Sequence, residues 1–205
     1  DKMALFNINN SFFKFINKLL DVLLLNLLWI LCSLPVVTIG AATCAAFSVT
    51  LKMVDDEEGY IVKPFFKYFK QNFKQGTLMW IFTAPQIYLL YLLWQLVFKS
   101  DDINAIIIIG VIFLTALSIS INIYSYPLIA RYENSLKKII KNSFGISIQY
   151  FGKTIILIAV IALEFFLILW NRWTLLVGII IGPEFVIYTI SGVSKKIFLQ
   201  IEKQQ

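Results

Sequence analysis

The stretch AIIIIGVIFLTALSISINIYSY, residues 105–126, decides the fold class because it is strongly apolar and contains no charged side chain. A helix needs about 20 residues to cross the hydrocarbon core of a bilayer, and this stretch is long enough to do so. Window hydropathy finds similar runs on both sides of it. The expected membrane spans are residues 19–35, 38–53, 77–98, 105–126, 154–170 and 173–192.

The composition of the whole chain agrees with a membrane class. Of the 205 residues, 59% are apolar and only 15% are charged, whereas an ordinary soluble domain has about 25% charged residues. A soluble domain of this size would leave large apolar patches in water. We therefore expect an all-α integral membrane protein, with residues 1–205 forming a single transmembrane domain.

The two apolar runs before Met53 are harder to assign, because Pro35 and Gly40 interrupt them. They form either two short spans or one span and a re-entrant piece. Lysine and arginine in short loops stay on the cytoplasmic side of a membrane. With six spans and a cytoplasmic N-terminus, all 18 basic residues except Lys99 and Arg172 lie on that side. This distribution predicts about six transmembrane helices, arranged as three hairpins, with both termini in the cytoplasm.

A basic amphipathic segment is expected before each hairpin, at residues 4–18, 63–75 and 134–147. In the second segment the lysines follow helical spacing and the phenylalanines form the opposing stripe. This composition is typical of a helix that lies in the membrane interface and contacts anionic headgroups. The candidate lipid or partner contacts in these segments are Lys63, Phe65, Phe66, Lys67, Phe69, Lys70, Phe73, Lys74, Lys137, Lys138 and Lys141.

The residues that most enzymes need are missing from the sequence. It contains no histidine, which is the commonest general base and zinc ligand. It also lacks a phosphate-binding loop, a dinucleotide fingerprint and a serine-nucleophile elbow. The net charge of +6 comes from basic residues at the ends of apolar runs. Positive residues that flank membrane spans on the cytoplasmic side have this distribution. We therefore expect no enzymatic activity, no cofactor, no metal and no nucleic-acid partner.

Two carboxylates, Glu164 and Glu184, lie inside expected spans. An ionisable group in lipid costs about 3 kcal/mol on insertion scales, so each should face the helix bundle or water. One interpretation is an intramembrane site for an ion or polar ligand. The other is a neutral glutamate that hydrogen-bonds to a neighbouring helix. Polar bonds between helices are likewise expected from Asn26, Asn122 and Gln86.

An acidic run, comprising Asp55, Asp56, Glu57 and Glu58, is expected on the cytoplasmic side. Carboxylates of this kind can bind a divalent cation, but the run lacks the alternating spacing of a calcium loop. A solvated turn, or a contact surface for a basic partner, fits the pattern better.

Four motifs give the chain a family resemblance. They are Asn26 with Trp29 and the run LPVVTIGAAT (34–43), DEEGY (56–60), FFKYFKQNFKQ (65–75) ending near Trp80, and YPLIARYE (126–133). In this order and spacing they resemble the YesL-like family of small bacterial membrane proteins. The resemblance implies a companion of carbohydrate ABC importers in Gram-positive bacteria, and it implies no catalytic residues.

Three functional hypotheses follow. The first is an accessory subunit in the cell membrane that associates with the permease of a carbohydrate ABC importer and stabilises or modulates transport. The second is a small autonomous transporter or channel that uses Glu164 and Glu184. The third is a membrane sensor or assembly factor that binds a soluble partner through the acidic run and the basic helices.

Overall fold

A computed structural model describes residues 11–54, 60–100 and 104–203. Over these residues the fold is helical and contains no β-strand. A short 3-10 turn, η2 (Val36–Thr38), precedes the second helix. The α-helices are α1 (Ser11–Ser33), α2 (Ile39–Met53), α3 (Val62–Lys99), α4 (Ala105–Arg131), α5 (Leu136–Gln149), α6 (Phe151–Leu169) and α7 (Arg172–Glu202). The predicted all-α class is confirmed.

Six of the described helices are long and apolar enough to cross a membrane. They are α1, α2 together with η2, α3, α4, α6 and α7. The doubtful region before Met53 forms two helices, because the chain leaves α1 at Ser33 and re-enters a helix only after Pro35 and η2. The prediction of about six helices that could span a membrane is confirmed.

Two of the expected basic segments are continuous with the helices that follow them. Segment 63–75 and span 77–98 form the single helix α3, which passes through Gly76 without a break. The described part of segment 4–18, from Ser11, is continuous with α1. The predicted boundary between each basic segment and its span lies where the composition changes from basic to apolar residues. Such a change does not end a helix. The third segment forms a separate helix, α5.

The core is organised around α2. In its span window 67% of the residues are buried, compared with 6–28% in the other five candidate spans. α2 contacts α1, α3, α4 and α7. Much of it consists of glycine and alanine, and small side chains allow neighbouring helices to approach closely.

The closest of these approaches joins α2 to α3. A Cβ atom added to Gly40 would lie 2.1 Å from the carbonyl oxygen of Gly76 and 2.6 Å from the Cβ of Trp80. Neither glycine position can hold a larger residue without moving a helix backbone. The Gly40–Gly76 contact therefore fixes where α3 crosses α2.

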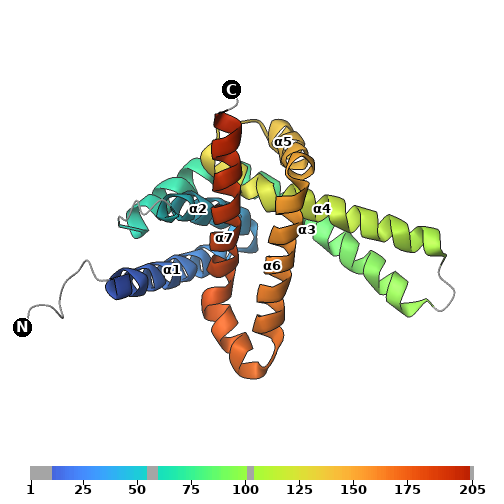
Figure 1. Cartoon of the computed structure of the whole chain (residues 1–205), viewed down its shortest axis with the longest axis horizontal. Helices are drawn as coiled ribbons and strands as arrows, with labels where there is room; N and C mark the ends of the chain where they lie inside the picture. The colour runs from blue at the N-terminus through green and yellow to red at the C-terminus, as the bar shows by residue number, and fades with distance from the viewer. Residues whose placement is uncertain (1–10, 55–59, 101–103, 204–205) are drawn as a thin grey trace, which may run out of the picture.

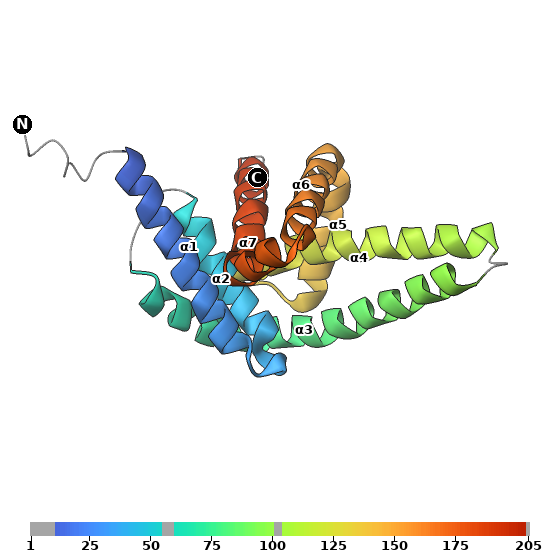
Figure 2. The same cartoon turned by 90° about the horizontal axis from the view of Figure 1, so that it is seen from below.

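Two helix pairs extend from this core in different directions. Figures 1 and 2 show α3 and α4 side by side, projecting away from α2, while α6 and α7 form a second pair that points elsewhere. Most of the surface of both pairs is apolar and exposed, as expected of helices that face lipid or another membrane protein.

Candidate functional site

The hydrogen-bond ladder of α7 is interrupted at Pro183, and α1 contributes the residue that fills the break. Proline has no backbone N–H and cannot complete the ladder. The side-chain nitrogen of Asn26 donates to the carbonyl of Ile180 at 2.6 Å. Its side-chain oxygen accepts from the backbone N–H of Glu184 at 3.1 Å. One buried carboxamide thus bridges two backbone groups that are partners in a regular helix.

Glu184 points from this break towards α2. Its side chain is fully buried, and its Oε1 lies 2.5 Å from the Thr50 hydroxyl. Thr50 is also 2.8 Å from the carbonyl oxygen of Ala46, one turn earlier in α2. The second carboxylate oxygen of Glu184 is buried and has no hydrogen-bond partner among the described residues. Helices α1, α2 and α7 therefore meet in a buried polar cluster.

Glu164 makes a separate contact between α6 and α7. Its Oε1 accepts a hydrogen bond from the Thr189 hydroxyl at 2.6 Å. Its side chain is 8% exposed and borders an apolar cavity of about 390 Å³ between α6 and α7. The structure gives the two predicted intramembrane glutamates different hydrogen-bond partners on different helices.

The other predicted polar residues of the spans also bond between helices. Asn122 of α4 donates to the Gln86 side chain of α3 at 3.1 Å. The Thr83 hydroxyl donates to the Asn122 side-chain oxygen at 2.9 Å. Together with the bonds of Asn26, these contacts confirm that Asn26, Gln86 and Asn122 join neighbouring helices.

The phenylalanine stripe of the basic segment at the start of α3 is divided between protein and surface. Phe65 is fully buried and Phe69 packs against the core, whereas Phe66 and Phe73 are each 43% exposed. The lysines of this segment are exposed, and they are Lys63, Lys67, Lys70 and Lys74. Part of the stripe that was expected to enter lipid therefore holds α3 on the protein core.

Helix α5, like the start of α3, has exposed lysines on one face and buried apolar residues on the other. Lys137, Lys138 and Lys141 are exposed, while Ile139 on the opposite side is 1% exposed. The acidic residues Asp55, Asp56, Glu57 and Glu58 lie outside the described residues.

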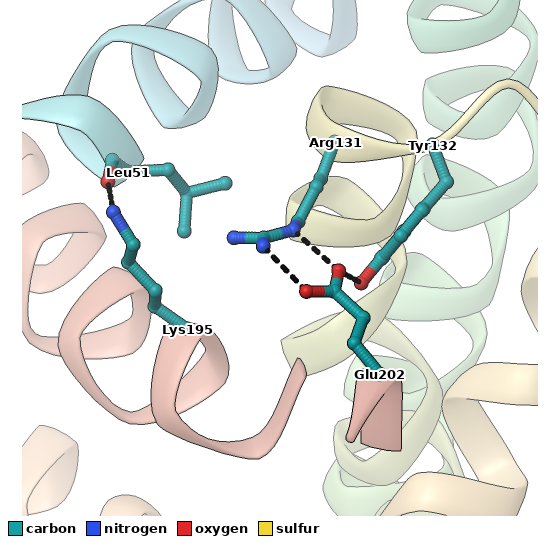
Figure 3. Close-up of polar contacts among 5 residues, drawn as sticks. All are labelled: Leu51, Arg131, Tyr132, Lys195 and Glu202. Carbon is teal, nitrogen blue, oxygen red and sulfur yellow. Dashed lines mark hydrogen bonds and ion pairs between the residues drawn. The ribbon is translucent and has the colours of Figure 1, made fainter. Parts of the chain in front are cut away.

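The structure adds a polar cluster at the end of α4 and α7 that the sequence did not indicate. Arg131 donates from Nε and Nη2 to the two carboxylate oxygens of Glu202, at 3.1 and 3.0 Å, and Tyr132 donates to the same carboxylate at 2.5 Å. Close by, Lys195 of α7 donates to the carbonyl of Leu51 at 2.7 Å (Figure 3). Arg131 and Tyr132 lie in the YPLIARYE motif, and this motif is the sequence feature that could have drawn attention to the cluster.

An apolar cavity of about 590 Å³ lies between the two projecting helix pairs. Residues of α1, α2, α4, α6 and α7 line it, among them Trp29, Phe47, Tyr126, Phe165 and Ile179. We refer to it as the central groove. Its wall on α7 includes Gly182 and Pro183, so the groove adjoins the break that Asn26 bridges.

Comparison with known proteins identifies the N-terminal part of this structure. Residues 22–94 match the model of a family described as "Protein of unknown function, DUF624". This segment is similar to the DUF624 family. The DUF624 segment contains most of α1, all of α2 and most of α3, and therefore both Asn26 and the Gly40–Gly76 contact. The family resemblance predicted from the motifs is confirmed.

A relative extends the similarity beyond the DUF624 segment. The Bacillus subtilis (strain 168) protein "Uncharacterized protein YteU" is 26% identical over 147 residues. The alignment covers 70% of this chain and 66% of that protein, so the chain spans just under two thirds of the relative's length. No solved structure matches the chain.

Proposed function

We propose that this protein is an accessory subunit of a membrane complex in the bacterial cell membrane. Its partner is the permease of a carbohydrate ABC importer, which it stabilises or modulates. The DUF624 similarity supports this proposal because the motif resemblance implies such a companion role. The absence of histidine, which leaves few options for acid–base chemistry, agrees with a binding role.

The observation that carries the proposal is the central groove. A groove lined by aromatic and aliphatic side chains between diverging helix pairs suits the apolar surface of a transmembrane helix. Helices associate in membranes through close packing of their surfaces, and an open apolar groove allows such packing. In this proposal one permease helix lies between the α3–α4 pair and the α6–α7 pair.

The proposed topology places the basic surfaces on the cytoplasmic side. The helices form three hairpins, with both termini in the cytoplasm, because this arrangement leaves only Lys99 and Arg172 outside. The exposed lysines of α3 and α5 then face anionic headgroups or cytoplasmic parts of the partner.

Two neighbouring residues of α7 provide a matched test. Ile179 and Ile180 are 56% and 57% exposed, but of the two only Ile179 lines the groove. We expect tagged wild-type protein, purified from its native host in mild detergent, to recover permease subunits. Ile179→Trp fills the groove and should lower that recovery, whereas Ile180→Trp faces outward and should retain it.

Three results would contradict the proposal. The first is that wild-type protein recovers no permease. The second is equal recovery by both tryptophan variants in spite of normal expression. The third concerns topology: a cysteine placed at the exposed Phe66 should react with a membrane-impermeant reagent only after the cells are opened. Reaction from the cell exterior would invert the proposed topology.

A further inference from the structure

Three basic side chains meet around one cavity at the ends of four helices. Lys52 lies in the last turn of α2 and Arg131 in the last turn of α4. α7 contributes Lys195, and α3 contributes Tyr68. The cavity that these residues border has a volume of about 420 Å³, within the usual range for small-molecule sites.

The contacts of the three cations hold them in place around this cavity. Lys195 is only 6% exposed, and its ammonium donates to the Leu51 carbonyl. The Lys52 ammonium lies 5.3 Å from the centre of the Tyr68 ring. Arg131 uses Nε and Nη2 to bind Glu202, and Figure 3 shows its remaining nitrogen on the side of Leu51 and Lys195.

The lining of this cavity combines positively charged and hydroxyl-bearing residues with Leu51, Ala130 and Leu199. Besides the three cations it includes the side chains of Ser48 and Tyr68, and no carboxylate of the described residues lines it. Glu202 bonds Arg131 from outside the lining. Cations near a helix C-terminus also compensate the helix dipole, which explains the contact of Lys195 with Leu51. Compensation of the helix dipole explains one such contact, but it does not explain why three cations border the same cavity.

We propose that this cavity binds a phosphate group, which we call the cationic site. Lysine and arginine beside hydroxyl groups are the usual partners of phosphate oxygens, and burial strengthens such charged hydrogen bonds. The phosphate belongs either to an anionic lipid headgroup or to a soluble phosphorylated compound. The site does not depend on the proposed permease partner, so its test is independent of that proposal.

The experiment uses the full chain and two probes. Inorganic phosphate is titrated into purified protein at constant ionic strength, and its affinity is measured by calorimetry. In parallel, protein in nanodiscs of phosphatidylcholine, with or without phosphatidylglycerol, is released and examined by native mass spectrometry for retained lipid. Binding of phosphate indicates a soluble ligand, whereas selective retention of phosphatidylglycerol indicates a headgroup. Either result supports the cationic site if it depends on Lys52.

Lys52→Gln tests this dependence, because Lys52 is exposed and its replacement leaves the core intact. We expect phosphate affinity to fall by about tenfold, or retained phosphatidylglycerol to be lost, since one unit charge close to the ligand is removed. Lys196→Gln is the matched control, because Lys196 is exposed and does not line the cavity. Failure of wild-type protein to bind either probe, or equal losses in both variants, would overturn the proposal.

Discussion

The side-chain oxygen of Asn26 accepts a hydrogen bond from the backbone N–H of Glu184, although the two residues are 158 positions apart in the sequence. The same side chain donates to the carbonyl of Ile180 and, at 3.4 Å, to that of Ile179, which has no helical N–H partner because position 183 is proline. Glu184 in turn lies beside Thr50 of α2. This single junction joins the DUF624 segment to the last helix of the chain.

Replacing Asn26 with leucine should destabilise this junction. Leucine removes every one of these bonds and leaves the N–H of Glu184 and the carbonyls of Ile179 and Ile180 without their side-chain partner in an apolar environment. An unsatisfied buried polar group costs about 1–3 kcal/mol, and a loss of that size lowers the unfolding temperature by several degrees. Thermal unfolding in detergent checks the effect. Asn142→Leu is the control, because Asn142 is exposed; equal shifts in both variants would refute the role assigned to Asn26.

The contact between α2 and α3 should be equally sensitive to a single methyl group. Gly40→Ala places a Cβ within 2.1 Å of the Gly76 carbonyl oxygen, so a helix backbone has to move. Overpacking of this kind costs about 1–3 kcal/mol. Gly110→Ala is the control because nothing lies within 4 Å of its added Cβ, and alanine favours a helix. The ranking of the two unfolding temperatures is the measurement, and a Gly40→Ala protein as stable as Gly110→Ala would contradict the close contact.

Hydropathy and the cost of burying polar groups were sufficient to predict part of this structure. Both are properties of a short segment, so the spans and the interhelical roles of Asn26, Gln86 and Asn122 followed from the sequence. The continuity of α3 did not, because its basic half and its apolar half were assigned to different environments. Burial of Phe65 against the core shows that tertiary packing, rather than lipid alone, determines how this segment lies.

The pairings within the candidate sites required the structure. Nothing local to Asn26 indicates Glu184, and nothing near Arg131 indicates Glu202, 71 positions later. Such pairs depend on which helices are neighbours, and hydropathy does not determine this. The same limit applies to the cationic site, because Lys52, Arg131 and Lys195 come from three helices that are distant in the sequence.

Tyr132 should make the stability of the fold depend on pH under alkaline conditions. Burial, followed by its hydrogen bond to Glu202, raises the pKa of Tyr132 from 10.0 to about 12. The folded state therefore holds this proton more tightly than the unfolded state. Below pH 10 Tyr132 is protonated in both states, so its contribution to stability does not change with pH. As pH rises from 10 to 12 the unfolded state loses the proton first, so the folded state loses stability.

Comparison of wild-type protein with Tyr132→Phe isolates this contribution. Below pH 10 the difference in stability between the two proteins should be constant, and between pH 10 and 12 it should change against the wild type, because only the wild type loses stability through this titration. Phenolate absorbance during the titration gives an independent value for the pKa. A difference that stays constant up to pH 12 would show that Tyr132 titrates normally.

Glutamine should replace Glu184 at little cost, while alanine should not. The hydroxyl hydrogen of Thr50 can go to only one of its two neighbours, Ala46 or Glu184. In Glu184→Gln the amide nitrogen can donate to the Thr50 oxygen while Thr50 donates to Ala46, so the contact between α2 and α7 is kept. Glu184→Ala removes the contact and leaves a cavity at a fully buried position, which should cost about 1–3 kcal/mol. Unfolding temperatures in detergent distinguish the variants, and a Gln variant as unstable as the Ala variant would show that the junction needs the carboxyl group itself.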